Sequence, residues 1–313
     1  MNLPFLSQLN EVRSALIIGA GGGYDIFCGL PFFVALRNAG KEVHLANISS
    51  GVVSFCDAEN PIPGLWKITP QTAATKYFPE MHLASWLSRN SFNVPLYAIA
   101  PAGAAPVSAA FRWLAENLQI DTLILVDGGT DILMRGDEAG LATPEGDAVS
   151  LFAGNELHQV SRRFIACIGF GIDAHHGICH AHFLENVAAL TVEGGYLGAW
   201  SLPSDSEEFK FYRDAYEFAS ARLEQPSIVN SSIISAISGN FGDFHTSNRT
   251  EGSSLFINPL MGMYWAFRLE NVAKRNLYLE CLRGTTSWND VAFEIEKFRE
   301  SLSQIRPWAA IPG

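Results

Sequence analysis

The sequence predicts an α/β protein: a doubly wound, mainly parallel sheet with helices on both faces (Rossmann-like), followed by a helical C-terminal part. Short apolar runs recur along the chain, and a helical pattern follows each of them. Runs that are apolar on both faces are typical of parallel strands buried between two helix layers. The predicted strands are residues 14–19, 42–47, 94–100, 122–127, 163–171 and 196–202.

The remaining segments are harder to assign. We expect the short runs 227–237 and 253–258 to extend the sheet, and residues 261–276 and 287–302 to be helical. The sequence contains no internal repeat, low-complexity tract or linker, which favours a single α/β domain over residues 1–313. Segments 132–150 and 203–275 are candidates for a lid or cap.

Composition narrows the choice of partners. Hydrophobic residues make up 48% and charged residues 17% of the 313 residues, a balance typical of a folded globular chain. The formal net charge of -11 and the lack of a Lys/Arg cluster argue against a nucleic acid or an anionic membrane as partner. We therefore expect a small-molecule substrate that is cationic, neutral or metal-bridged, and the sequence leaves homo-oligomerisation open.

The cysteines and the apolar runs bear on location. The five cysteines are scattered and form no CxxC pair, as expected for reduced thiols. No apolar run approaches the ~20 residues of a membrane span, and the N-terminus lacks the pattern of a secretory signal. A cytoplasmic location is the expectation.

In a doubly wound sheet, ligands bind outside the carboxyl ends of the strands, where loops and helix N-termini converge. The first such loop has the sequence GAGGGYD and supplies the candidate substrate-binding residues Gly21, Gly22, Gly23, Tyr24 and Asp25. It almost matches a dinucleotide fingerprint, but the third glycine of that motif would fall on Tyr24. Asp25 could equally cap the next helix, and it would then occupy the loop N–H groups and repel an anion.

The second loop follows the strand that ends at Asp127. The substrate-binding candidates here are Gly128, Gly129, Thr130 and Asp131, and Asp127 is a candidate catalytic residue. Carboxylates at a strand end can hold a divalent cation, accept hydrogen bonds from ribose, or act as a general base. Helix capping is the alternative role for Asp131.

The third loop has the sequence GIDAHHGICHAH. Asp173, His176 and His180 are candidate catalytic residues, and Asp173, His175 and His176 form a candidate metal site. If a helix begins near residue 177, its phase directs His176 and His180 toward the crevice. The alternative is that these histidines only pack against the core.

Several motifs together carry a resemblance. The ordered set GAGGGYD, VDGGTD, RGDE, GLATP, GIDAHHGICHAHFLENVA and INPLM resembles a family of mostly archaeal and bacterial proteins described only as a domain of unknown function. This resemblance covers nearly the whole chain and implies no activity.

A second, partial resemblance is to ureohydrolases of the arginase and agmatinase type. Asp173, Ala174 and His175 match the first three positions of their Asp-Ala-His-x-Asp manganese motif, whereas Gly177 replaces the last aspartate. No later Asp-x-Asp-x-x-Asp-Pro segment is present, so the resemblance implies a dinuclear manganese site only in part.

Three hypotheses follow. The first is a hydrolase or group transferase that acts on a small polar substrate with Asp127, Asp173, His176 and His180, either with a Zn, Mn or Mg ion or with a histidine as general base. The second is a protein that binds NAD or a nucleotide through the GAGGGYD loop and transfers or cleaves a ribosyl bond. The third is a non-catalytic, ligand-binding regulatory module.

Overall fold

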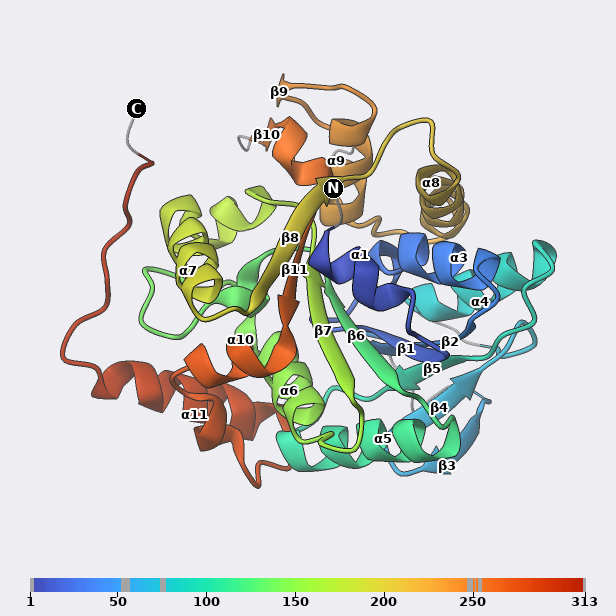
Figure 1. The fold of residues 1–313 in the computed structure, drawn as a ribbon, viewed down its shortest axis with the longest axis horizontal. Coiled ribbons are helices and arrows are strands. Elements are labelled where there is room, and N and C mark those ends of the chain that lie inside the picture. Colours follow the sequence, from blue (N-terminus) through green and yellow to red (C-terminus); the bar gives the residue numbers. More distant parts are fainter. Residues whose placement is uncertain are drawn as a thin grey trace.

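We describe the protein from a computed structural model, for residues 3–51, 57–73, 77–246, 250, 252 and 255–311. Its main feature is one sheet with the strand order β3-β4-β5-β2-β1-β6-β7-β11-β8 (Figure 1). Strands β5, β2, β1, β6 and β7 run parallel, while β3, β4, β11 and β8 pair antiparallel with their neighbours. The strands are β1 (Ser14–Gly19), β2 (Glu42–Ile48), β3 (Glu59–Ile62), β4 (Leu65–Ile68), β5 (Leu96–Ile99), β6 (Thr122–Asp127), β7 (Arg162–Cys167), β8 (Tyr196–Ser201) and β11 (Met263–Arg268).

The predicted fold class is confirmed, and each of the six predicted strands is a strand of this sheet. Every residue of β1 and β6 is buried, as expected for strands covered on both faces. Alternate side chains enter opposite cores: Leu16 and Ile18 pack into one apolar cluster and Ile17 into the other. Because the strands are apolar on both faces, helices must cover both sides of the sheet.

Helices cover the two faces in two layers (Figure 1). One layer contains α1 (Pro4–Leu9), α2 (Asp25–Cys28), α3 (Leu30–Asn38), α4 (Pro79–Arg89) and α8 (Glu207–Ser220). The other contains α5 (Ala104–Asn117), α6 (Pro144–Asn155), α7 (His180–Val192), α10 (Leu269–Arg275) and α11 (Trp288–Ser301). Short turns η2 (Asp131–Leu133), η3 (Ile172–His176), η5 (Pro259–Gly262) and η6 (Leu279–Leu282) complete these connections.

Three predictions of secondary structure were wrong. The run 227–237 forms helix α9 (Ile228–Ile237), because the Ser227 hydroxyl accepts the Asn230 N–H and caps a helix there. The described residues of the run 253–258, which are 255–258, contribute β10 (Phe256–Ile257), which pairs with β9 (Gly242–Asp243) in a separate two-stranded sheet; residues 253 and 254 lie outside the described residues. The segment 261–276 begins in turn η5 and becomes α-helical only after Arg268, since its aromatic first half forms β11 inside the main sheet.

The candidate lid segments contribute to the body of the protein. Ile132, Leu133 and Met134 are buried in the core, and α6 packs against α5. Within 203–275, α8 packs against α3 and α4, and β11 lies between β7 and β8. In the described part of this segment, α9, the β9–β10 pair and turn η5, which packs on α9, lie above the ends of the strands rather than in the sheet (Figure 1).

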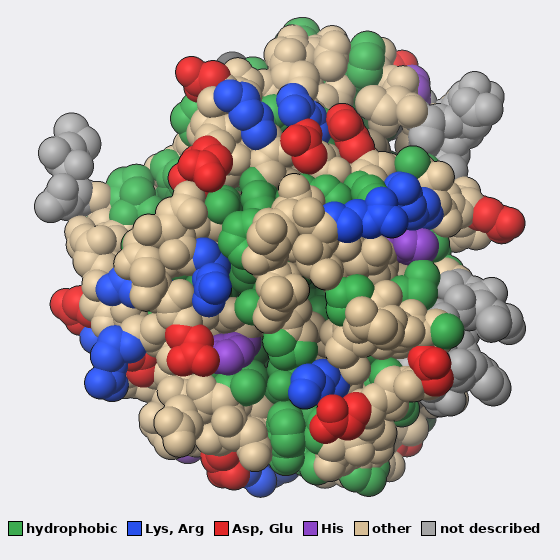
Figure 2. Space-filling model, turned by 90° about the vertical axis from the view of Figure 1, so that its right-hand side faces the viewer, with side chains coloured by type: hydrophobic (Ala, Val, Ile, Leu, Met, Phe, Trp, Pro, Cys, Tyr) green, Lys and Arg blue, Asp and Glu red, His purple; other side chains and the backbone are tan. Residues whose placement is uncertain are grey.

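No helix among residues with a described position is long and apolar enough to cross a membrane. On the face turned to the viewer in Figure 2, basic and acidic side chains are interspersed with neutral ones.

Candidate functional site

The carboxyl ends of β1, β6 and β7 bring together five aspartates. Asp127, Asp131, Asp147 and Asp173 are buried, with at most 8% of each residue exposed, and Asp25 is half-buried. The five residues come from five elements: Asp127 is the last residue of β6, and the others lie in α2 (Asp25), η2 (Asp131), α6 (Asp147) and η3 (Asp173). The three loops singled out in the sequence therefore meet at one edge of the sheet, where the fold predicts a ligand.

The glycine loop holds a carboxylate. Asp25 is the first residue of α2, and its Oδ2 accepts a hydrogen bond from the Gly21 N–H at 2.8 Å. The backbone N–H groups of Gly22 and Gly128 also stabilise this carboxylate. Asp25 does not cap α2 but folds back onto the loop, so the N–H groups that could have bound a phosphate are directed at Asp25.

The second loop places Asp127 and Asp131 on either side of two glycines. Asp127 Oδ2 accepts a hydrogen bond from the Ile132 N–H at 3.3 Å. The side chain that binds a backbone N–H at the start of turn η2 is therefore that of Asp127 rather than that of Asp131. Asp131 Oδ2 accepts the Thr143 N–H at 3.5 Å and ties this loop to the start of α6. Thr130 donates its N–H to Asp173 Oδ2 at 2.9 Å, which joins the second loop to the third.

Asp147 is the site residue that the sequence analysis did not single out. It lies in the first turn of α6, just after Pro144 begins that helix. The helix start lies against the glycine loop, because a Cβ on Gly146 would come within 2.5 Å of the Gly21 carbonyl oxygen. The only local signal was an acidic residue in the first turn of a helix, which is common at helix N-termini.

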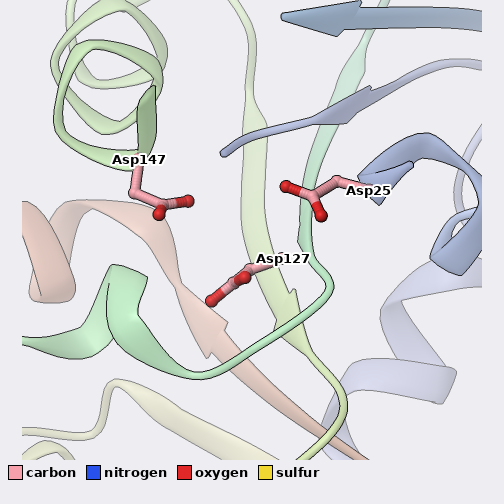
Figure 3. A group of neighbouring side chains, drawn as sticks. All are labelled: Asp25, Asp127 and Asp147. Carbon is pink, nitrogen blue, oxygen red and sulfur yellow. The ribbon is translucent and has the colours of Figure 1, made fainter. Parts of the chain in front are cut away.

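Asp25, Asp127 and Asp147 form a candidate metal centre. Each offers one carboxylate oxygen, and these three oxygens all lie within 4.8 Å of one another. Figure 3 shows the three side chains converging on a common space from α2, the end of β6 and α6. Across all described residues this is the one group of three or more Asp, Glu, His or Cys side chains so arranged.

Asp147 carries an additional sign of a missing partner. Its Oδ1 is buried and accepts no hydrogen bond from any described residue, and only 3% of Asp147 is exposed. A buried carboxylate oxygen without a partner costs free energy, because it has lost water and gained nothing in return.

The electrostatics of the five carboxyl groups also indicate that a positive partner is missing. Burial, followed by repulsion from Asp131, raises the pKa of Asp25 to about 7, and burial raises the pKa of Asp131 to about 6. Burial and repulsion from neighbouring aspartates also raise the pKa of Asp127, Asp147 and Asp173. No ion pair among the described residues involves any of these five side chains. Near neutral pH the cluster must therefore take up protons or a cation.

The histidines lie beside this cluster rather than in it. Turn η3 ends at His176 and α7 begins only at His180, so the expected continuous helix phase from residue 177 is wrong. Positive φ at Gly177 separates the two elements. His175 and His176 are exposed and their rings lie 3.8 Å apart, while His180 is half-buried with its ring 5.1 Å from that of Phe170.

The structure therefore does not unite the predicted metal ligands. Asp173 is buried and bonded to Thr130, whereas His175 Nδ1 lies 2.6 Å from the Ile172 carbonyl oxygen.

Burial lowers the pKa of His176 and His180, which keeps both imidazoles neutral near pH 7.

Gly129 gives a first testable prediction. A Cβ there would lie 2.7 Å from Asp173 Oδ2, 3.0 Å from Asp131 Oδ1 and 3.2 Å from Asp127 Oδ1. Gly129→Ala should displace these carboxylates and weaken divalent-cation binding by about tenfold or more, by analogy with the loss of supporting contacts at metal sites. Isothermal titration with Mn²⁺ measures this, and near-ultraviolet circular dichroism checks that the fold persists. Unchanged affinity would show that these three carboxylates do not act together.

One comparison with known proteins places the chain. A protein-family profile with the description "Protein of unknown function (DUF1152)" matches residues 16–299. No curated protein and no solved structure matches the chain.

Proposed function

Because the chain belongs to the DUF1152 family, whose function is unknown, we propose its activity from the site: a hydrolase or group transferase that acts on a small polar substrate and uses a divalent cation held by aspartates. Asp25, Asp127 and Asp147 would hold the cation. The substrate would enter at the carboxyl edge of the parallel strands, next to the glycine loops.

The observation that supports this proposal best is the unpartnered Oδ1 of Asp147 beside two further carboxylates. A buried oxygen that lacks a donor and faces like charges is poorly placed for any purely structural role. A cation would satisfy that oxygen and remove the repulsion at once.

The ligand set favours Mg²⁺ or Mn²⁺ among the metals considered. All three candidate side chains offer carboxylate oxygens, and hard cations such as Mg²⁺ and Mn²⁺ prefer oxygen. Zn²⁺ usually takes nitrogen or sulfur ligands, and neither His175 nor His176 joins this group. Mg²⁺ also retains several waters when it binds few carboxylates, which leaves positions for a substrate.

A cation held by Asp25, Asp127 and Asp147 would lower the pKa of a bound water, and nearby side chains would accept and pass on the proton that this water releases. Asp173 is the proposed general base, since its Oδ2 and the oxygens of Asp127 and Asp131 all lie close to the same point beside Gly129. His176 and His180 are proposed as proton carriers between this centre and solvent, because they are partly exposed and neutral near pH 7.

Metal binding tests the proposal directly. Protein purified without an affinity tag should bind Mn²⁺ or Mg²⁺ stoichiometrically in isothermal titration, and any hydrolytic or transfer activity found in a substrate panel should fail with chelator and return with Mn²⁺. The His175→Ala/His176→Ala double variant should bind the cation with unchanged affinity. Wild-type protein that binds neither cation would contradict the proposal, and a large loss in the histidine variant would move the site to the third loop.

The nucleotide hypothesis has less support, because the Gly21 N–H is already bonded to Asp25 and an anion would meet that carboxylate. A thermal-shift panel of NAD and nucleotides, run with and without Mg²⁺, separates the two hypotheses. Stabilisation by a nucleotide without Mg²⁺ would favour the glycine loop as a phosphate site.

A further inference from the structure

Behind the glycine loop lies a second buried acidic group, outside the aspartate cluster. Glu80, in the first turn of α4, and Asn47, in β2 beside Gly19 of β1, are both fully buried. Asn47 Nδ2 donates to Glu80 Oε1 at 2.8 Å and to the Gly23 carbonyl oxygen at 2.9 Å. One carboxamide therefore joins helix α4 to the glycine loop.

Each member of this pair has one oxygen left over. Asn47 Oδ1 and Glu80 Oε2 are both buried, and neither has a hydrogen-bond partner among the described residues. Both are acceptors when Glu80 is ionised, so they cannot satisfy each other in that state. A single proton on Oε2 changes this, because a carboxylic acid and a primary amide can form two parallel hydrogen bonds: N–H to Oε1 and O–H to Oδ1.

We propose that Glu80 is a positioning residue that carries a proton and pairs with Asn47 in this doubly hydrogen-bonded form, which holds the glycine loop where Asp25 can bind the cation. The proposal rests on the proposed function for its last step. Its earlier step, the protonated acid–amide pair, stands on the geometry of Asn47 and Glu80 alone.

The surroundings of the pair fit a neutral acid. Burial raises the pKa of Glu80 to about 7. Asn47, the Ser49 hydroxyl and the Glu80 N–H stabilise the anion less than burial destabilises it, and none of them forms a hydrogen bond with Oε2. Apart from Glu80, these groups are uncharged. The titratable groups on the loop side include Tyr24 of the loop itself, Asp25, which bonds Gly21, and Tyr77, whose hydroxyl lies 3.7 Å from the position of a Cβ on Gly23.

The packing leaves the carboxamide little freedom to find another partner. A Cβ on Gly19 would lie 2.0 Å from Asn47 Oδ1, so the amide lies directly against the end of β1. When Glu80 loses its proton, both remaining oxygens are acceptors and neither can donate to the other, and we expect the hydrogen bond to Gly23 to lose its support. Protonation is complete well below pH 7 and is lost as the pH rises above that value.

Glu80→Gln tests the proposal, because a glutamine amide can make both hydrogen bonds and never ionises. We expect the variant to bind Mn²⁺ as the wild type does at pH 6, where Glu80 carries its proton. At pH 8.5, where wild-type Glu80 has lost the proton, the variant should bind Mn²⁺ about tenfold more tightly than the wild type, the change in affinity that corresponds to one pKa unit. Glu80→Ala should bind more weakly at both pH values. The exposed Glu59→Gln is the matched control and should follow the wild type. A ratio of affinities between Glu80→Gln and wild type that stays constant with pH would overturn the positioning role.

Two measurements do not depend on the cation. The infrared difference between wild type and Glu80→Gln at pH 6 should contain the carbonyl band of a protonated carboxylic acid, and its absence would overturn the acid–amide pair. Amide hydrogen exchange of residues 19–25 should rise in Glu80→Ala and stay at the wild-type level in Glu80→Gln at pH 6. If both results appear while no cation binds, the pair stands and only the proposed function fails; equal exchange in all three proteins would overturn the hold on the loop.

Discussion

Asp147→Asn is expected to weaken Mn²⁺ binding by at least about 100-fold, since loss of even a supporting residue at a metal site costs 10–100-fold. The same change should raise the stability of the cation-free protein at pH 8. The substitution removes a carboxyl group whose pKa is raised by burial and by repulsion from Asp131, Asp25 and Asp173. The asparagine amide that replaces it can donate a hydrogen bond to a neighbouring carboxylate. Titration calorimetry and urea unfolding measure the two effects.

Asp147→Asn should weaken Mn²⁺ binding but stabilise the cation-free protein, and these opposite effects distinguish a cation ligand from a structural residue. A residue with only a structural role would lose stability when changed, whereas a buried cation ligand gains it in the absence of the cation. Glu145→Gln is the matched control, because Glu145 lies in the same first turn of α6 but outside the group of three carboxylates. Reduced stability of cation-free Asp147→Asn, or unchanged Mn²⁺ affinity, would remove Asp147 from the site.

The second large effect is a loss of stability with rising pH in the absence of a cation. Folding raises the pKa of Asp25 from 3.8 to about 7 and that of Asp131 from 3.8 to about 6, so the folded protein holds protons that the unfolded chain has released. Stability from this source is complete below the unfolded pKa and is lost as the pH rises through the folded values. Each proton held contributes a slope of about 1.4 kcal/mol per pH unit.

Urea unfolding in the presence of a chelator should therefore show stability falling between about pH 4 and pH 7. Saturating Mn²⁺ should flatten this slope near neutral pH, because the cation replaces the protons and stabilises the folded state by mass action. Asp147→Asn should reduce the slope without Mn²⁺. A chelated protein whose stability rises over this interval would show that the carboxylates are already compensated.

Much of the fold could be predicted from the sequence because its strands are local signals. Runs such as 14–19 and 122–127 are apolar on both faces, and only a sheet covered on both sides buries them. β11 was not predictable in the same way, since its aromatic residues also fit a helix and its place between β7 and β8 is decided by pairing with distant residues.

The candidate site could be predicted in part for a related reason. Asp127 ends a strand that the sequence identifies, and Asp25 and Asp173 lie in the loops after two others, so the rule for strand ends places the three together. Asp147 reaches the same place only because α6 starts against the glycine loop, a contact between Gly146 and Gly21 that no local pattern encodes. The spacing of His176 and His180 predicts one helix face, but positive φ at Gly177 interrupts the helix that would have aligned them.

The position of β11 has a consequence for the order in which the sheet can assemble during synthesis. Residues 196–201 of β8 join the sheet only through residues 263–268, which the ribosome delivers more than sixty residues later. Until then β7 presents a bare edge and β8 has no partner among the sheet strands already made, a state that exposes unpaired backbone groups. The edges of β7 and β8 therefore stay unpaired with each other until residues 263–268 are made, and the strand that closes this gap lies next to β7, whose end leads into Asp173.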